Sequence, residues 1–195
     1  MDTWDEGLAA RVVDCLHLYQ LDRFDSALSL ACVAVDGTSR RVYADMRSAA
    51  RYKKFVRDNM CALFTSPLGI VSPCIRIGFR HPRVNLDNDG FADRVDVLYH
   101  VVRCGLLHES SLGDTLRLVP NIAIAVEREG TRLLVGPEIV VGLIAAVIGS
   151  PANANVKTRT GLRLGVGQFH VSLDQAWGMG EMLCALFTAP RLGGP

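Results

Sequence analysis

The sequence predicts a mainly α-helical protein, in which a helical bundle is followed by an appended β-hairpin and C-terminal helices. Apolar residues recur at helical spacing over most of the 195 residues. Strand-like runs are short, and the clearest pair is joined by a turn that contains glycine. The composition, 49% hydrophobic and 21% charged, is typical of a chain with a globular core. We expect a helical domain over residues 1–118 and a second part over residues 119–195.

The N-terminal helices are predicted from apolar spacing and from their end signals. Residues 6–35 have a helical pattern, and Asp36-Gly37-Thr38 is expected to end it. Thr38 or Ser39 then caps the clearest helix of the chain, residues 39–64. Its apolar side chains form one stripe at i, i+3, i+4 spacing, and basic residues dominate its other face.

The middle of the chain is predicted to be a long loop followed by another helix. Prolines and glycines interrupt residues 65–90, where 70–79 is the one extended piece we expect. Residues 91–108 return to helical spacing, and Asn88 or Asp89 is the expected N-cap.

The second part is expected to begin with a β-hairpin. Its strands would be Asn121–Val126 and Thr131–Val135, with the turn at Glu127–Gly130. Pro137 would then open a helix over residues 138–148, because proline is tolerated in a first helical turn.

A loop, a second hairpin and a last helix are expected to complete the chain. Residues 150–155 have loop composition, and 162–173 alternates weakly, as an edge hairpin does. Residues 174–187 are predicted to be helical if Gly178 and Gly180 are packing contacts.

Charge, cysteine usage and hydropathy limit the expected partners and location. With a net charge of +1, nucleic-acid binding has to come from a local patch. The six cysteines are scattered without a C-x-x-C pair, as expected for reduced core residues of a cytosolic protein. The N-terminus lacks the apolar region of a signal peptide, and no apolar stretch reaches the roughly 20 residues of a membrane span. We therefore expect a cytoplasmic protein that does not enter a membrane.

Arg103 and His108 are the candidate catalytic residues. Cleavage of RNA by transesterification needs a base for the 2′-OH, an acid for the leaving oxygen and a cation for the phosphate. Histidine titrates near neutral pH, and arginine binds phosphate oxygens without losing its charge. This scheme needs no metal and no cofactor.

One histidine does not easily serve as both acid and base, so we expect a homodimer that brings two copies of the pair into one cleft. The apolar helices over 139–148 and 176–187 are the candidate dimer interface.

Other interpretations of this segment stay open. On an unbroken helix, five residues turn through about 500°, so the two side chains would point about 140° apart. They converge if the helix bends, which Gly105 permits. An arginine and a histidine at a helix C-terminus also simply complement the helix dipole. Cys104 and His108, at i and i+4, share a face and would suit a thiol nucleophile or half of a zinc site, although no further ligands lie at zinc spacing.

The segment Arg103-Cys-Gly-Leu-Leu-His108 resembles the R-x4-6-H motif of the HEPN superfamily (higher eukaryotes and prokaryotes nucleotide-binding domains). The resemblance covers about residues 6–118, including an aromatic residue shortly before the arginine and an earlier basic helix. It implies a helical bundle in which Arg103 and His108 are the catalytic pair. Many HEPN proteins are metal-independent ribonucleases of toxin–antitoxin and other bacterial defence systems, so the resemblance also implies RNA, a second copy of the chain and an antitoxin or defence protein as partners.

Two positions depart from the HEPN pattern. The residue after the motif arginine is often polar in active ribonucleases and is Cys104 here. In one toxin branch a tyrosine that a partner modifies follows the histidine by two residues, and that position is Ser110 here. The alternative function is therefore a catalytically inactive HEPN-like protein that binds RNA or a partner.

The candidate RNA contacts are basic and aromatic residues on two helices. Such residues bind the phosphate backbone and stack on bases, and Tyr43, Tyr52 and Phe55 are further stacking candidates. A basic helix face is also commonly no more than a solvated surface. The predicted RNA-binding residues are Arg47, Arg51, Lys54, Tyr99 and His100.

Overall fold

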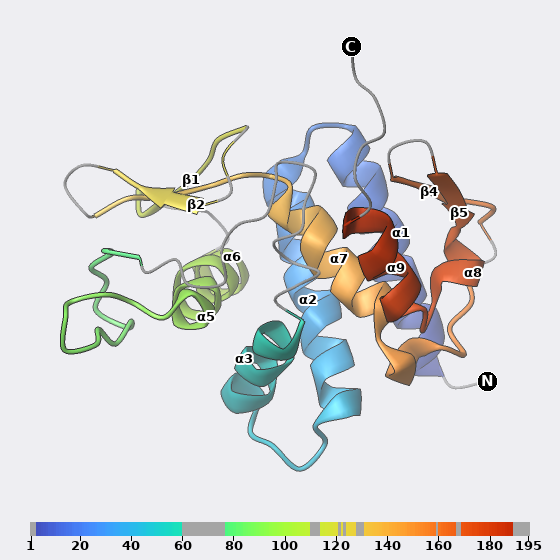
Figure 1. Ribbon diagram of the computed structural model, residues 1–195, viewed down its shortest axis with the longest axis horizontal. Helices are drawn as coiled ribbons and strands as arrows, with labels where there is room; N and C mark the ends of the chain where they lie inside the picture. Colours follow the sequence, from blue (N-terminus) through green and yellow to red (C-terminus); the bar gives the residue numbers. More distant parts are fainter. Residues whose placement is uncertain are drawn as a thin grey trace.

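A computed structural model describes residues 3–59, 77–109, 114–120, 122, 124–127, 131–158, 160–166 and 169–188. It begins with two long helices, α1 (Thr3–Gln20) and α2 (Phe24–Val42), which lie side by side (Figure 1). A tight turn joins them, and the Cys15 thiol donates a hydrogen bond across the pair to the Ala27 carbonyl oxygen at 3.1 Å. The helical content of the described residues confirms the mainly α-helical prediction.

Helix α2 continues through Asp36-Gly37-Thr38, so the predicted stop at these residues is wrong. Thr38 and Ser39 are fully buried, and their hydroxyl groups are satisfied within the fold. The Ser39 hydroxyl donates to the Asp36 carbonyl oxygen at 2.9 Å, and the Asn153 amide donates to the Thr38 hydroxyl at 3.0 Å. Tertiary packing therefore overrides the local preference of these residues for a turn.

The predicted helix over residues 39–64 is divided between two elements. Its first residues complete α2, a turn follows, and α3 spans Ser48–Asp58 with Arg47 at the N-cap position. On α3, Tyr52 and Val56 are buried, so this part of the predicted apolar stripe is correct. Val42 is 39% exposed because it lies on the other helix. The predicted continuation beyond residue 59 falls outside the described residues.

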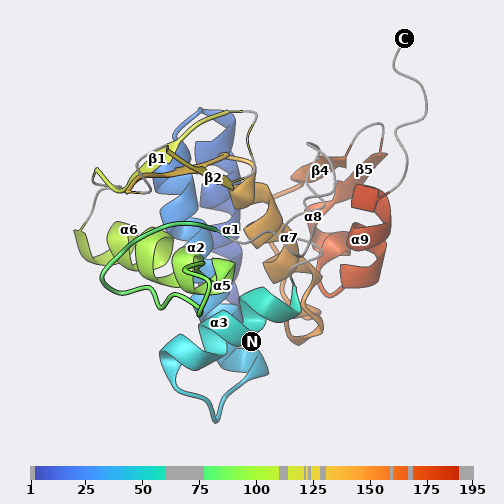
Figure 2. The ribbon, with the colours of Figure 1, turned by 60° about the vertical axis from the view of Figure 1, so that its left-hand side comes forward.

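The third helical region consists of three consecutive elements of different geometry. They are α5 (Arg94–Val97), the π-helical η1 (Leu98–Arg103) and α6 (Cys104–Glu109). The N-cap is Asp93, whose carboxylate accepts a hydrogen bond from the Val95 backbone at 2.8 Å, so the predicted caps at residues 88 and 89 are wrong. Helix α6 contacts α2, and α5 contacts α3 (Figure 2).

A three-stranded sheet follows, formed by β1 (Leu116–Leu118), β2 (Ile124–Val126) and β3 (Leu133–Val135). Strands β2 and β3 pair in an antiparallel manner, which confirms the predicted hairpin. Strand β1 pairs with β3 in parallel and was not expected, since three residues are too few for a recognisable alternation.

Helix α7 (Ile139–Gly149) lies at the centre of the fold, between α2 and the C-terminal helix (Figure 1). The prediction of a helix after Pro137 is confirmed. All of its residues except Val141 are buried within the chain itself, which accounts for its strongly apolar composition without a partner subunit. The 3-10 helix η2 (Pro151–Asn153) follows, and it buries Asn153 although a loop was expected there.

The C-terminal segment contains the hairpin β4 (Arg163–Val166) and β5 (Phe169–Ser172), as predicted, and then α8 (Leu173–Ala176) and α9 (Gly180–Thr188). The single helix predicted over 174–187 is therefore broken. Gly178, with a φ of 78°, provides the break, because residues with a side chain rarely adopt this conformation.

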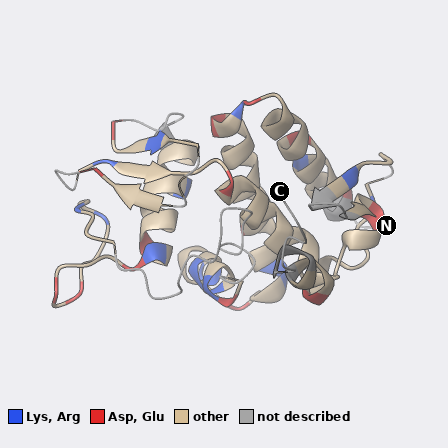
Figure 3. Cartoon of the chain, turned by 45° about the horizontal axis from the view of Figure 1, so that its top comes forward, with Lys and Arg blue, Asp and Glu red and all other residues tan. Residues whose placement is uncertain are grey.

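One continuous set of buried apolar side chains runs from α1 to α9, so the two parts of the chain share a core. Basic and acidic residues are interspersed over the molecule, whereas the central helix α7 carries no charged residue (Figure 3). Within the described residues, no helix combines the length and the apolar character required to cross a membrane.

Candidate functional site around Arg103

The backbone around Arg103 departs from regular α-helix. Arg103 is the last residue of η1, and the Cys104 amide donates to the carbonyl oxygen of Tyr99, five residues earlier. Such i to i+5 bonds are rare and often accompany functional sites. Gly105, where we expected a bend, lies inside α6, so the irregularity precedes Arg103 instead of separating it from His108.

The guanidinium of Arg103 lies between a carboxylate and an aromatic ring. Its Nη2 atom is 3.1 Å from the Asp36 carboxylate of α2, and its centre is 5.4 Å from the centroid of the Tyr99 ring. The Arg103 side chain is 12% exposed and that of Asp36 27%. The pair therefore joins α2 to η1 in a largely buried position, where an ion pair is screened less than at the surface.

Buried thiols and a phenol surround this ion pair. Tyr52 of α3 shares a hydrogen bond with Cys32 of α2, and both side chains are fully buried. Burial raises the pKa of Cys32 to about 11 and that of Cys15 to about 12. Both thiols are therefore neutral near pH 7 and are poor nucleophiles. Cys104 is also buried, and the three cysteines are unpaired thiols, as predicted. Cys61, Cys74 and Cys184 fall outside the described side chains.

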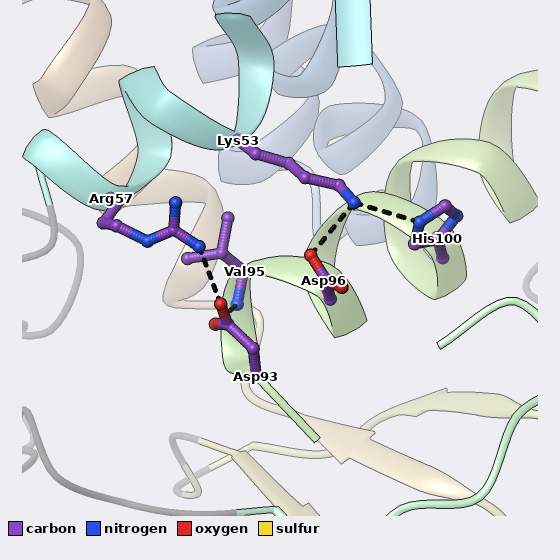
Figure 4. A network of polar contacts seen from close by, with 6 residues as sticks. All are labelled: Lys53, Arg57, Asp93, Val95, Asp96 and His100. Atoms are coloured by element: carbon purple, nitrogen blue, oxygen red, sulfur yellow. Dashed lines mark hydrogen bonds and ion pairs between the residues drawn. The ribbon is translucent and has the colours of Figure 1, made fainter. Parts of the chain in front are cut away.

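A second polar group joins α3 to the beginning of the same helical region. The Lys53 ammonium is 2.9 Å from the Asp96 carboxylate and 3.1 Å from Nε2 of His100. Nearby, the Arg57 guanidinium is 2.6 Å from the carboxylate of Asp93 (Figure 4). Lys53 also lies over the Tyr99 ring, at 5.2 Å, so this group is continuous with the surroundings of Arg103.

The two predicted catalytic residues are placed on adjoining elements. Arg103 ends η1, and the backbone of His108 belongs to α6. The side chain of His108 lies outside the described residues. The assignment of His108 as a catalytic residue therefore stays a prediction.

The predicted RNA-binding residues divide into an exposed and an enclosed group. Arg47 and Lys54 are exposed at the surface of α3, although Lys54 is engaged by Asp58 at 2.9 Å. Arg51 and His100 are partly buried, and Tyr99 is only 9% exposed. Tyr99 packs against the Arg103 guanidinium and His100 contacts Lys53, so these two residues lie within the fold instead of on an open basic surface.

Most aromatic residues suggested for base stacking are engaged within the fold. Tyr52 and Phe55 are buried, so their expected role as stacking residues is wrong in this conformation. Tyr99 packs edge-on against Tyr52, with ring centroids 5.4 Å apart, which leaves little of its ring for a base. Tyr43 donates a hydrogen bond to Asp58. Helical periodicity indicated that these residues face one way, but the neighbouring helix that covers them could not be known.

Sequence reasoning missed the carboxylates of this site. Asp36 was interpreted as part of a helix stop, and Asp93 and Asp96 were not associated with the basic helix. Their partners lie 36 to 67 residues away in the chain, too far for a local pattern to reveal. The sequence signal that pointed to these carboxylates was the excess of basic residues on α3, which is compatible with acidic partners from other parts of the chain. Among the described residues, His, Cys, Asp and Glu side chains form no group of three suited to a metal ion.

The fold and this site define a mainly α-helical protein with a largely buried arginine–carboxylate pair next to a lysine–histidine pair. The chain belongs to the Rv1289 family, whose family model matches residues 7–192. No curated protein and no solved structure matches the chain.

Proposed function

We propose that this protein is a metal-independent endoribonuclease of the HEPN type that acts as a homodimer in a bacterial defence or stress system. The observation that supports this proposal best is the π-helical segment η1, which presents His100 and Arg103 and leads directly into the helix that carries His108. A positively charged guanidinium whose position is fixed by neighbouring groups suits the binding of a phosphate. The resemblance to the HEPN motif adds the reaction class.

In the proposed reaction, the 2′-oxygen of the ribose attacks the adjacent phosphorus and the 5′-oxygen leaves. His108 removes the proton from the attacking hydroxyl or protonates the leaving oxygen, and His108 of the second copy performs the other transfer. Arg103 binds the non-bridging oxygens and stabilises the charge that develops on them. The Asp36 carboxylate already binds the Arg103 guanidinium. The phosphate therefore has to bind Arg103 together with Asp36 or displace Asp36 from it.

The test is an RNA cleavage assay with the full-length protein in the presence of EDTA. Labelled single-stranded and hairpin RNAs are expected to yield fragments with 2′,3′-cyclic phosphate and 5′-hydroxyl ends. Arg103→Ala and His108→Ala are each expected to reduce the rate by about 100-fold or more. Arg117→Ala and His17→Ala, which alter exposed residues of β1 and α1, serve as matched controls and leave the rate unchanged. Equal cleavage by Arg103→Ala, His108→Ala and wild type would contradict the assignment.

The alternative is a catalytically inactive HEPN-like protein that binds RNA or a partner protein. The observation in its favour is that carboxylates already engage the cations of this region. Asp36 is paired with Arg103, Asp96 with Lys53 and Asp93 with Arg57. RNA binding without cleavage, measured by fluorescence anisotropy in the same samples, would support this alternative and exclude the nuclease.

A further inference from the structure

The contact between Lys53 and His100 joins two elements that are far apart in the sequence. Lys53 lies on α3 and His100 on η1, and 3.1 Å separates Nζ from Nε2. Asp96, one turn before His100, contacts the same ammonium at 2.9 Å. The side chains of Lys53 and Asp96 are 22% and 17% exposed, so the group is largely withdrawn from solvent. Figure 4 shows the ammonium between the carboxylate and the imidazole.

The chemistry of this contact fixes the charge of His100. An ammonium group is only a donor, so Nε2 has to accept the hydrogen bond. An imidazole nitrogen accepts only when it carries no proton, which means that the ring is neutral and that its proton is on Nδ1. Protonation of His100 would replace an attractive contact by two cations at hydrogen-bond distance. The contact and the charged form of His100 are therefore mutually exclusive.

Burial and the basic groups around His100 also favour its neutral form. Burial lowers the pKa of His100 most, and the cation of Lys53 lowers it further. His81 and Arg83, from the segment that precedes α5, also lower it, whereas Asp96 raises it. The ring of Tyr99, which lies edge-on at 4.9 Å, carries no charge at neutral pH, because a phenol has a pKa of about 10 and burial raises that of Tyr99 further. Among the described residues, Asp96 is the carboxylate that acts against this shift, and it is shared with Lys53.

We propose that Lys53 and His100 form a proton-sensitive clasp: neutral His100 holds α3 against η1, and protonated His100 releases Lys53 and loosens α3. The release reaches the Arg103 region because Lys53 and Arg103 both lie over the ring of Tyr99, at 5.2 and 5.4 Å. Acidification therefore increases access to Tyr99 and Arg103. This proposal is independent of RNA cleavage, since it concerns only the contact between two helical elements.

The direct test combines an NMR titration of the histidine rings with hydrogen exchange of the α3 amides. His100 is expected to titrate below the usual value of about 6.5. Protection factors in α3 are expected to fall as the pH drops below about 6.5 and through the lowered pKa of His100, while those of α1 and α2 remain constant. Each unit by which the contact lowers the pKa of His100 corresponds to about a tenfold rise in the ratio of open to closed clasp once His100 is protonated.

Two variants distinguish the release of the Lys53–His100 contact from a general loss of stability at low pH. In His100→Gln, the amide oxygen can accept from Lys53 but does not titrate, so the protection of α3 is expected to become independent of pH over this range. In Lys53→Met, the cation is removed while the aliphatic length is kept, so the pKa of His100 is expected to rise. His17→Gln, at an exposed position of α1, is the matched control and should retain the wild-type response.

Three results would overturn the clasp. The first is a His100 that titrates at or above the ordinary value in the wild type. The second is protection of α3 that does not change with pH although His100 becomes protonated. The third is a pH response in His100→Gln equal to that of the wild type. Each can be observed whether or not the protein cleaves RNA.

Discussion

Arg103 shows how far a single residue can be interpreted from sequence. The position of Arg103 near the end of a helical region could be predicted from the sequence, and the backbone agrees with that prediction. Its carboxylate partner could not, because Asp36 lies 67 residues earlier in a segment whose local signals indicate a turn. Asp36 reaches the guanidinium because α2 continues through Asp36 and the residues after it. Tertiary packing, and not the local sequence, determines that continuation.

The ion pair between Asp36 and Arg103 leads to a stability prediction. Asp36→Asn preserves the size of the side chain but leaves a largely buried guanidinium without its carboxylate. Because the pair is intermediate between surface and core, we expect a loss of about 1–3 kcal/mol in the free energy of unfolding. Urea denaturation measures this loss. Asp45→Asn, at an exposed site in the turn after α2, is the control and should stay within about 0.5 kcal/mol. A loss no larger than that of the control would assign the pair no structural role.

At the scale of elements, periodicity predicted where helices occur better than where they end. The helix after Pro137 and the two hairpins lie where their patterns predict, although the second hairpin alternates only weakly. The ends of α2 and α3 differ from prediction. The Ser39 hydroxyl donates within the helix to Asp36 and the Thr38 hydroxyl accepts from Asn153 of η2, so neither residue acts as a cap. A capping residue is effective only when its surroundings leave the helix end exposed.

Close packing of α7 on α9 leads to a prediction about two glycines. A Cβ added at Gly149 would lie 2.8 Å from the backbone of Gly180, a contact that no side-chain movement can relieve. Gly149→Ala is therefore expected to reduce the free energy of unfolding by about 1–3 kcal/mol.

The matched control for this variant is another helical glycine with free space around it. A Cβ added at Gly37 in α2 meets no atom of the described residues within 4 Å. Gly37→Ala should therefore stabilise the protein by about 0.5–1 kcal/mol, because alanine favours a helix interior. Thermal unfolding of both variants measures the two effects. Changes of the same sign would show that the α7–α9 contact yields more readily than its geometry indicates.

At the scale of the whole molecule, composition predicted a helical protein but not the order in which its helices pack. The apolar character of α7 was expected to indicate a dimer interface, and the chain instead buries this helix between α2 and α9. A helix that is apolar on all sides has two explanations, an internal position or a partner, and the sequence does not distinguish them. The burial of α7 removes one of the two helices predicted as a dimer interface, and the other, over residues 176–187, stays a prediction.

The proposed composite site makes a prediction that only a dimer can satisfy. If each active cleft combines Arg103 and His108 from two copies, Arg103→Ala and His108→Ala can complement each other. After denaturation and joint refolding, about half of the dimers contain one chain of each kind. Each of these retains one arginine and one histidine, so the histidine performs one proton transfer and water the other, whereas each variant refolded alone lacks either both arginines or both histidines. We expect the mixture to cleave RNA faster than the sum of the two variants refolded separately. Light scattering of each sample establishes that dimers are present. Dimers that exchange chains without any gain in cleavage would contradict a cleft in which one arginine and one histidine from different copies suffice.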